Sequence, residues 1–377
     1  MVVGKEPALQ SFEDTWDHRS IVFVIADAGN IALTYLKNAW YLAAFADELK
    51  AGQMLARTVL GESLVFFRSP DGTVASLFDR CPHRFAPLSE GKLCDGGASV
   101  ECGYHGLRFG GQGACLHNPH GNGSIPKAAR VKSYVTREIN GMIWWWAGEP
   151  DSADASLIPD CSEIINAPSD ATVRGFLPTA CHYQLLVDNI LDLTHADYLH
   201  AGSLGSGALS RCRPQVEDLS DRSVRVSWIS RGDHAPPAFD SHLRLQGQLT
   251  DQWTEVTWFA PSVMQLRVGA TLQDEPRERG VQAMTWHIAT PETAERTHYW
   301  YWSTRNFAIS PQANAAIGPL IEHAFAKQDK PMLEAQQRRI GNCDFWSLRP
   351  VLLQSDAAAA KVRRKLDAMI RDEGGTP

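Results

Sequence analysis

The chain has 377 residues, enough for two or three domains and for a large buried core without disulfide cross-links. Its composition, 44% apolar and 21% charged, is that of an ordinary globular protein, and its 14 Phe, 12 Trp and 8 Tyr argue against intrinsic disorder. The net charge of −7 disfavours nucleic acid as a partner, because nucleic-acid-binding proteins usually have a basic excess.

The sequence also disfavours a membrane or secreted protein. No stretch approaches the roughly 18 consecutive apolar residues of a membrane span, and the acidic residues 1–17 do not resemble a secretory signal. We therefore expect a cytoplasmic location and no membrane contact. In that compartment the eight cysteines are predicted to be thiols or metal ligands rather than disulfides.

The first part of the chain is predicted to be rich in β-structure. Residues 1–35 are expected to form an N-terminal extension, and residues 36–150 a domain of short strands separated by turn signals. The predicted strands include residues 56–60, 63–68, 74–78 and 136–146. Residues 91–126 are instead rich in Gly, Pro, Cys and His, which packing alone does not explain. Residues 148–152 predict a domain boundary.

Residues 151–377 are predicted to form a second domain that contains both helices and strands. Apolar periodicity predicts helices over residues 182–199, 313–340 and 357–370. Strands are predicted over residues 224–229, 242–249, 252–260, 263–268, 282–288 and 297–303. The predicted fold class is α+β: an N-terminal all-β domain, then a catalytic domain with an antiparallel sheet flanked by helices.

Two short Cys-His motifs are the strongest chemical signal. They are Cys81-Pro-His83 and Cys102-Gly-Tyr-His105, each with one thiolate and one imidazole in a tight loop. Such a set suits an iron–sulfur cluster whose two irons have different ligands. A tetrahedral zinc site is the alternative, although zinc fingers usually group Cys with Cys and His with His. The order Cys then His in both halves favours the cluster.

A second candidate metal site lies on the predicted helix over residues 182–199. Asn189, Asp192 and His195 are spaced by three, so they share one helix face, and burying them without partners would be unfavourable. His200 is rotated off that face on an ideal helix. Both imidazoles can therefore bind one metal only if the helix is distorted or ends near His200.

Two histidines and one carboxylate are the facial triad of non-haem Fe(II) oxygenases, so a third ligand is expected elsewhere in the chain. The C-terminal third offers Asp329, with Glu334 and Glu322 as competitors. We choose Asp329, although spacing alone does not separate the three.

Together these motifs resemble the α subunits of the Rieske non-haem iron oxygenases. The resemblance rests on C-x-H and C-x-x-H with Arg84-Phe-Ala-Pro87 beside them, on D-x-x-H-x-x-x-x-H, and on D-K-P-M-L-E-A-Q-Q, and it covers roughly residues 36–345. Thr290-Pro-Glu-Thr293 supports the group of vanillate O-demethylase, toluenesulfonate methyl-monooxygenase and dicamba O-demethylase.

The resemblance implies two iron cofactors and their ligands. A Rieske [2Fe–2S] cluster would be held by Cys81, His83, Cys102 and His105. A mononuclear Fe(II) would be held by His195, His200 and Asp329. Asp192 would bridge to a Rieske histidine, His105, of a neighbouring subunit in a homotrimer, and Asn189 would lie near the iron.

The resemblance further implies a terminal oxygenase acting on an aromatic substrate and O₂. The expected reaction is O-demethylation of a methoxy-aromatic compound to a phenol plus formaldehyde. Electrons from NADH would arrive only indirectly, through a flavin and iron–sulfur reductase or a ferredoxin. The aromatic strands offer His287, Trp286 and Trp258 as candidate substrate contacts. The alternatives are a ring hydroxylase or ring-dihydroxylating dioxygenase and, outside enzymes, a Rieske electron carrier or redox sensor.

Overall fold

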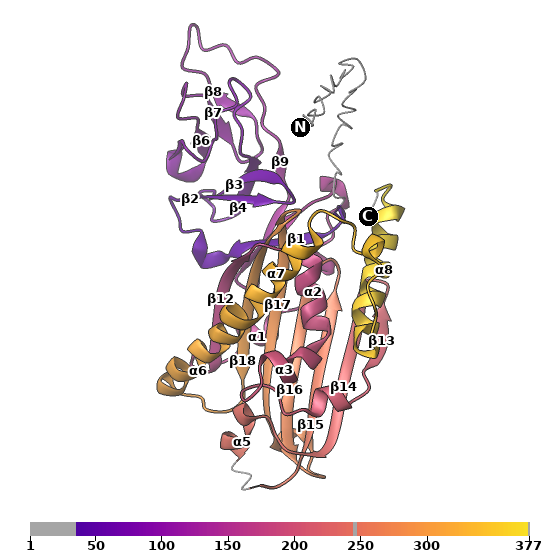
Figure 1. Cartoon of the computed structure of the whole chain (residues 1–377). Coiled ribbons are helices and arrows are strands. Elements are labelled where there is room, and N and C mark those ends of the chain that lie inside the picture. The colour runs from indigo at the N-terminus through magenta and orange to yellow at the C-terminus, as the bar shows by residue number, and fades with distance from the viewer. Residues whose placement is uncertain (1–34, 244–246, 376–377) are drawn as a thin grey trace, which may run out of the picture.

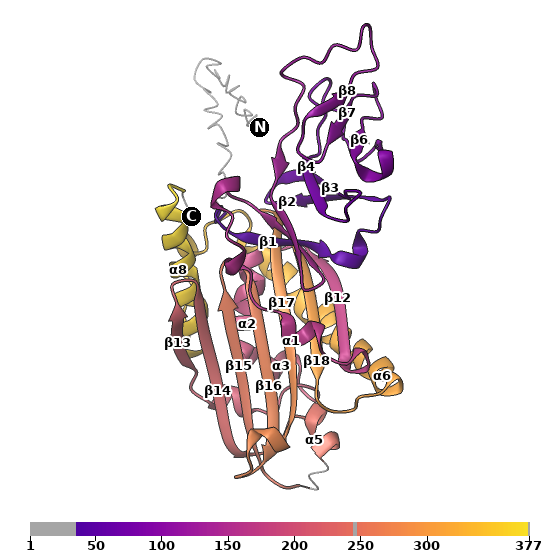
Figure 2. The same cartoon turned by 180° about the vertical axis from the view of Figure 1, so that it is seen from behind.

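The computed structural model describes residues 35–243 and 247–375, so the predicted extension over residues 1–35 lies almost wholly outside the described residues. A small β-region forms one end of the molecule, and a long sheet with a layer of helices forms the rest (Figures 1 and 2).

The N-terminal region contains three small antiparallel sheets. The first has the order β1 (Trp40–Phe45), β11 (Met142–Trp146), β10 (Thr136–Ile139). The second has the order β2 (Met54–Val59), β3 (Glu62–Arg68), β4 (Val74–Phe78), β9 (Ser133–Tyr134). The third has the order β5 (Lys92–Cys94), β6 (Ser99–Glu101), β7 (Arg108–Gly110), β8 (Cys115–His117), and it carries the segment whose composition was unusual.

The C-terminal region is built on one seven-stranded antiparallel sheet of order β12-β18-β17-β16-β15-β14-β13. Its strands are β12 (Thr172–Thr179), β13 (Gln215–Ser220), β14 (Ser223–Asp233), β15 (Thr250–Phe259), β16 (Val263–Leu272), β17 (Val281–Thr293) and β18 (Arg296–Arg305). The strand predicted over residues 242–249 is wrong where the structure describes it. Residues 242 and 243 end the helix α5 (Pro237–Leu243), whose first residue is a proline, and proline favours the first turn of a helix.

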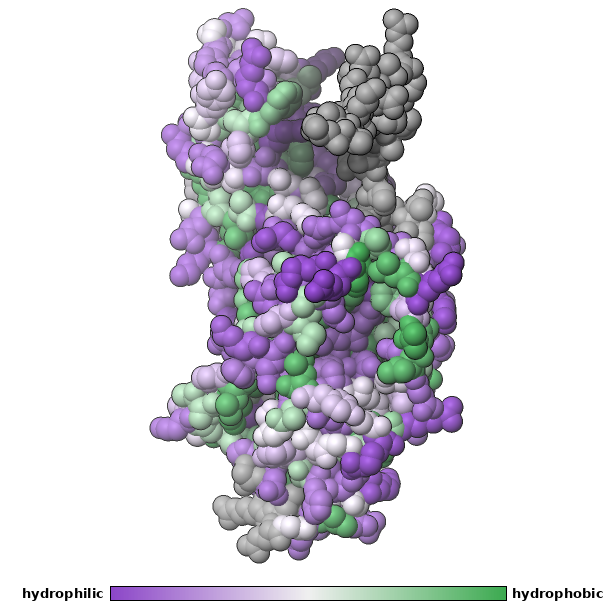
Figure 3. All heavy atoms as spheres, viewed as in Figure 1, coloured by the Kyte–Doolittle hydropathy of each residue, from purple (hydrophilic) through white to green (hydrophobic). Residues whose placement is uncertain are grey.

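Helices cover one face of this sheet, as the two opposite views show (Figures 1 and 2). They are α2 (Tyr183–Leu191), α3 (Ala196–Leu199), α4 (Ala208–Arg211), α6 (Pro311–His323), α7 (Lys330–Ile340) and α8 (Ala357–Asp372), and the short α1 (Ser162–Ile165) lies on the other face. The outer surface of the helical layer is mostly hydrophilic, with small apolar groups between (Figure 3). Within the described ranges no helix is long and apolar enough to cross a membrane.

The two regions share their hydrophobic cores. Alternate side chains of β1 and β11 enter two different clusters, and each cluster also contains residues of the large sheet. One cluster is rich in tryptophan and joins Trp40, Trp144 and Trp146 to Trp286, Trp300 and Trp302. Hydrogen bonds reinforce the junction: the Thr290 hydroxyl donates to the Leu42 carbonyl at 2.8 Å, and the Leu60 N–H donates to the Pro291 carbonyl at 2.9 Å.

Candidate functional site

The two Cys-His motifs form loops of the same backbone design. The N–H of each cysteine donates to the carbonyl five residues later at 2.8 Å, and each cysteine carbonyl accepts from the N–H four residues later at 2.9 Å. The residue that closes this turn has a positive φ in both loops, 61° at Phe85 and 73° at Gly106. Two matching loops thus bring Cys81 and Cys102 together from separate parts of the chain.

These loops bury the sulfurs and leave the imidazoles near the surface. Cys81 and Cys102 are buried, His83 is exposed, and the rings of His83 and His105 lie 4.5 Å apart between centroids. Burial, with Cys102 close by, raises the pKa of the Cys81 thiol to about 11. Such a thiol ionises readily only when a metal replaces its proton. A buried sulfur pair and an outer imidazole pair fit a cluster with one thiolate-bound and one imidazole-bound iron.

The second site depends on a break in the helix that carries it. Helix α2 ends at Leu191, and Asp192 has an extended conformation, with φ −125° and ψ 93°. The Asp192 side chain accepts from the Thr194 N–H at 3.0 Å, which caps the 3₁₀ turn Leu193–His195 before α3 begins. The chain then leaves the helix at His200. This break is the distortion that the spacing of His195 and His200 required.

The structure brings His195, His200 and Asp329 together. Asp329 Oδ1 lies 3.4 Å from His195 Nε2 and 3.2 Å from His200 Nε2, and one ligand atom from each residue lies within 4.8 Å of the others. Glu334 takes another role, since its carboxylate accepts from the Ala180 N–H at 3.0 Å. Glu322 is exposed. The geometry thus favours Asp329 over Glu334 and Glu322 as the third candidate ligand, a choice that spacing alone could not make.

Asp329 sits at the end of a π-helical segment, Ala324–Asp329, inserted between α6 and α7. Pro331 follows and lacks the N–H that would close a regular α-turn to the Lys327 carbonyl. Such insertions are frequent at functional sites. Burial raises the pKa of Asp329, but hydrogen bonds from the two imidazoles outweigh it and bring the pKa to about 2. Asp329 is therefore a carboxylate, as a metal ligand must be.

The outer nitrogens of both imidazoles have fixed partners. His195 Nδ1 donates to the Asp192 carbonyl at 2.6 Å, and His200 Nδ1 donates to Gln328 Oε1 at 2.8 Å. The Gln328 amide is itself oriented, because its Nε2 donates to the Leu199 carbonyl at 3.0 Å. With Nδ1 occupied, Nε2 is the nitrogen that faces Asp329 in both residues, and it is the one that a metal would bind in place of its proton. This arrangement fits a metal held by two imidazoles and one carboxylate.

Gln328 was not predicted from the sequence. Consecutive residues of a regular helix point about 100° apart, so the neighbour of Asp329 was not expected at the same site. Asn189, which was predicted to lie there, donates from Nδ2 to Asp329 Oδ1 at 3.4 Å.

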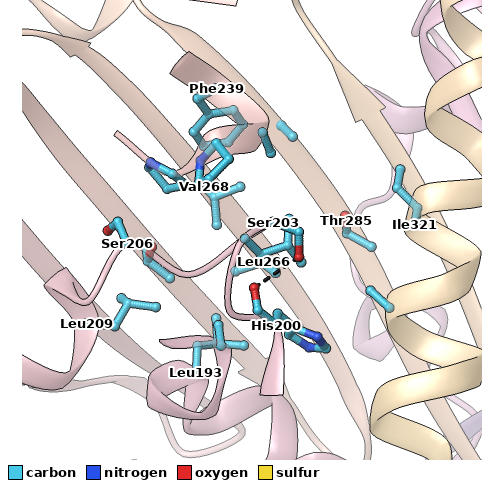
Figure 4. Close-up of a pocket in the computed structure, with 18 of the residues that line it drawn as sticks. Leu193, His200, Ser203, Ser206, Leu209, Phe239, Leu266, Val268, Thr285 and Ile321 are labelled. Carbon is cyan, nitrogen blue, oxygen red and sulfur yellow. Dashed lines mark hydrogen bonds between the residues drawn. The ribbon is translucent and has the colours of Figure 1, made fainter. Parts of the chain in front are cut away.

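A cavity of about 710 Å³ opens from these ligands between the helices and the sheet, and Figure 4 shows part of its wall. His287 lies in the wall and is fully buried. Its Nδ1 is 2.7 Å from the Tyr299 hydroxyl, and its Nε2 has no hydrogen-bond partner among the described residues. Burial lowers the pKa of His287 to about 3. Trp258 and Trp286 are packed in the hydrophobic cores instead, so neither contributes to the cavity wall.

Comparison with known proteins agrees with this architecture. Residues 39–134 match the Rieske [2Fe-2S] domain family, and residues 179–372 match the family of the vanillate O-demethylase oxygenase C-terminal domain. The dicamba O-demethylase oxygenase component of Stenotrophomonas maltophilia is 37% identical over 338 residues, which cover 89% of this chain and 98% of that protein. The chloroacetanilide N-alkylformylase oxygenase component of Rhizorhabdus wittichii is 37% identical over 343 residues, which cover 90% of this chain and 97% of that protein.

A solved structure gives the same result. Dicamba monooxygenase bound to 3,6-dichlorosalicylic acid is 37% identical and has a TM-score of 0.82, covering 90% of this chain and 99% of that one.

A Rieske-type β-region and a large antiparallel sheet, each with residues that could hold a metal, define an iron-dependent oxygenase. Enzymes of this class carry a Rieske [2Fe–2S] cluster and a mononuclear iron. The chain belongs to the Rieske non-haem iron oxygenase family, in the group of the dicamba and vanillate O-demethylase oxygenase components. The predicted resemblance and the α+β fold class are confirmed. Its relatives are components of multicomponent systems, which implies a separate reductase.

Proposed function

We propose that this chain is the terminal oxygenase component of a monooxygenase that O-demethylates a methoxy-aromatic compound, giving a phenol and formaldehyde. The observation that carries the proposal is the largely apolar cavity that opens directly from His195, His200 and Asp329. A methoxy group at that end would lie against the metal while the ring is held by the wall. Relatives over nearly the whole chain are O-demethylase oxygenase components of dicamba and vanillate.

We assign the metal ligands as the sequence suggested. His195, His200 and Asp329 would hold the iron, which supplies O₂ activation when bound. The Asp192 carbonyl and the Gln328 amide would keep the two imidazoles turned toward it. Asn189 would position the Asp329 carboxylate through its hydrogen bond.

The cluster would be held by both thiolates and both imidazoles of the matching loops. Its ligands would be Cys81, His83, Cys102 and His105. We also keep the division into a Rieske domain over residues 36–150 and a catalytic domain over residues 151–377. The turn Pro150–Ser152 directly follows β11 and supports this boundary.

We further propose a homotrimer in which the Rieske loops of one copy meet the iron site of the next. Within one chain, β6–β8 beside the Rieske loops and α3 beside the iron ligands lie far apart (Figures 1 and 2). Exposed aromatic side chains mark both places: Phe85 is 69% and Tyr104 66% exposed near the cluster loops, and Tyr198 on α3 is 78% exposed. Head-to-tail contacts of this kind close into rings.

Asp192 is suited to join the two sites. Its hydrogen bonds to the Thr194 N–H and hydroxyl both use Oδ1, at 3.0 and 2.6 Å. Oδ2 would then accept from His105 of the neighbouring copy. The electrons would originate from NADH and pass through a flavin and iron–sulfur reductase, directly or by way of a ferredoxin.

The proposed reaction is tested with the iron-loaded protein, chemically reduced without air and then given O₂ and a panel of methoxyarenes. We expect formaldehyde and the matching phenol in equal amounts, and neither product from the His200→Ala variant. Absence of formaldehyde with every methoxyarene of the panel would contradict O-demethylation. A ring diol would favour the dioxygenase alternative. Iron analysis should give three irons per chain, whereas a Rieske carrier would contain two.

A further inference from the structure

The cavity is far larger than one aromatic ring requires. A cavity of about 150 Å³ is enough to hold benzene, whereas this one measures about 710 Å³. That volume lies within the usual range of roughly 300–1,000 Å³ for pockets that enclose drug-sized ligands. A single methoxybenzene ring would leave most of the space unfilled.

The cavity is also long. On β17 the wall contains Ala283, Thr285 and His287, and four residue steps along a strand span about 13 Å. Figure 4 shows His200 at one end and Phe239 at the other, with Leu266 and Val268 between them. The space therefore extends along the strands from the iron ligands toward α5.

The wall between these ends is mainly apolar, and many of its polar groups are bonded within the protein. The Thr285 hydroxyl donates to Ser303 Oγ at 2.9 Å, the Ser203 hydroxyl to the His200 carbonyl at 3.0 Å, and Gln252 Nε2 to the His234 carbonyl at 2.8 Å. Three buried nitrogens of wall residues lack a partner in the described chain, namely Trp228 Nε1, Arg305 Nε and His287 Nε2. Because burial keeps this imidazole neutral, it offers a hydrogen bond rather than a charge.

Arg305 is the one Arg or Lys side chain in the wall as the structure describes it. Its guanidinium is buried: the two terminal nitrogens already donate to four protein oxygens, and Nε is enclosed without a partner among the described residues. The acceptors, at 2.9–3.1 Å, are the carbonyls of Asp170, Ala171 and Ala308 and the Asn314 side chain. Since a buried carboxylate requires a paired charge or strong hydrogen bonds, the wall suits a neutral ligand better than an anionic one.

We infer that the natural substrate is an uncharged, mainly apolar aromatic ether about two rings long, and not a single-ring benzoate. This inference rests on the proposed function and specifies its substrate class. The ether end would lie at His195 and His200, a neutral acceptor of the ligand would face His287 Nε2, and the second ring would lie between Leu266, Val268 and Phe239.

Equilibrium dialysis of the iron-loaded protein without air tests this with four probes. These are 4-methoxybenzamide, 4-methoxybenzoate and the corresponding 4′-methoxybiphenyl-4-carboxamide and 4′-methoxybiphenyl-4-carboxylate. An amide and a carboxylate have nearly the same shape, so the difference in affinity between the two at one ring length measures the effect of charge. The difference in affinity between the two amides measures the effect of length. We expect the biphenyl amide to bind at least tenfold more tightly than both the biphenyl carboxylate and the single-ring amide. Equal or tighter binding of either competitor, or binding of none, would overturn the inference.

Two variants locate the second ring. Ala283→Leu fills the far part of the cavity, so the biphenyl amide should lose at least tenfold in affinity and the single-ring amide much less. Gln282→Leu is the matched control. Gln282 precedes Ala283 and is exposed on the opposite face of the strand, so this substitution should leave both affinities unchanged. Equal losses for both amides in Ala283→Leu would contradict the placement. Because dialysis measures binding without turnover, a bound probe that releases no formaldehyde with O₂ would count against the proposed reaction and not against this preference.

Discussion

Replacing Gln328 by leucine isolates the group that orients one iron ligand. The substitution keeps the size of the side chain but removes the acceptor for His200 Nδ1 and the donor to the Leu199 carbonyl. Loss of such an orienting partner typically lowers metal affinity 10- to 100-fold, which corresponds to about 1.4–2.7 kcal/mol. His195 and Asp329 keep their contacts, so the site should weaken rather than disappear.

The assay is competition between the protein and a chelator for Fe(II) without air. Gln328→Glu keeps an acceptor for His200 Nδ1 and should hold iron at least as well as leucine does. Gln337→Leu is the matched control: this glutamine on α7 accepts from the His182 N–H, away from the iron ligands, so its loss should reduce stability without a specific loss of iron. If Gln328→Leu binds Fe(II) as tightly as the unmodified protein, the amide does not orient His200 and this reasoning is refuted.

Three further predictions concern ionisable residues and their partners. Arg363→Met removes three hydrogen bonds of 2.6–3.1 Å to Asp188 and leaves its half-buried carboxylate unpaired, so the free energy of unfolding in urea should fall by about 1–3 kcal/mol. An unchanged midpoint would contradict this. Asp192→Asn should retain both metal centres, because His195 contacts the backbone carbonyl of this residue and not its side chain. The reduced cluster of this variant should be oxidised much more slowly when O₂ and substrate are added. An unchanged rate of cluster oxidation would exclude the proposed bridge from Asp192 to His105. In the metal-free protein burial lowers the pKa of His200, but the hydrogen bond with Asp329 outweighs it and the pKa lies above 6.5. Iron must displace this proton, so Fe(II) affinity should rise with pH across neutrality, and a flat profile would contradict the linkage.

Much of the architecture was accessible from the sequence because its signals are local. The strands β3 and β4 were predicted to within one residue of their observed bounds, since apolar runs and the turn between them fix both ends. The spacing of His195 and His200 indicated that the helix is distorted or ends near His200, and the structure has both a break at Asp192 and a helix end at His200. Asp192 acts there as a cap, a common role for aspartate at the start of a helical turn.

The remaining features depend on tertiary contacts. Alternation along a strand assigns side chains to two faces, but it does not say which face borders the cavity, and Trp258 and Trp286 proved to be core residues. Gln328 reaches His200 through a π-helical segment that simple periodicity does not predict. The helix α5 replaced a predicted strand because the proline at its start favours a helical turn over pairing in a sheet.

The shared packing of β1 and β11 with the large sheet limits how this enzyme can move electrons. Side chains on both faces of these strands pack with residues of the catalytic region, so the two regions are joined through shared cores. In the proposed homotrimer, each protomer would pass electrons from its cluster to the iron of a neighbouring copy. Dilution below the dissociation constant of that trimer would then stop turnover while every iron site stays intact, so the activity of such an enzyme would depend on its own concentration.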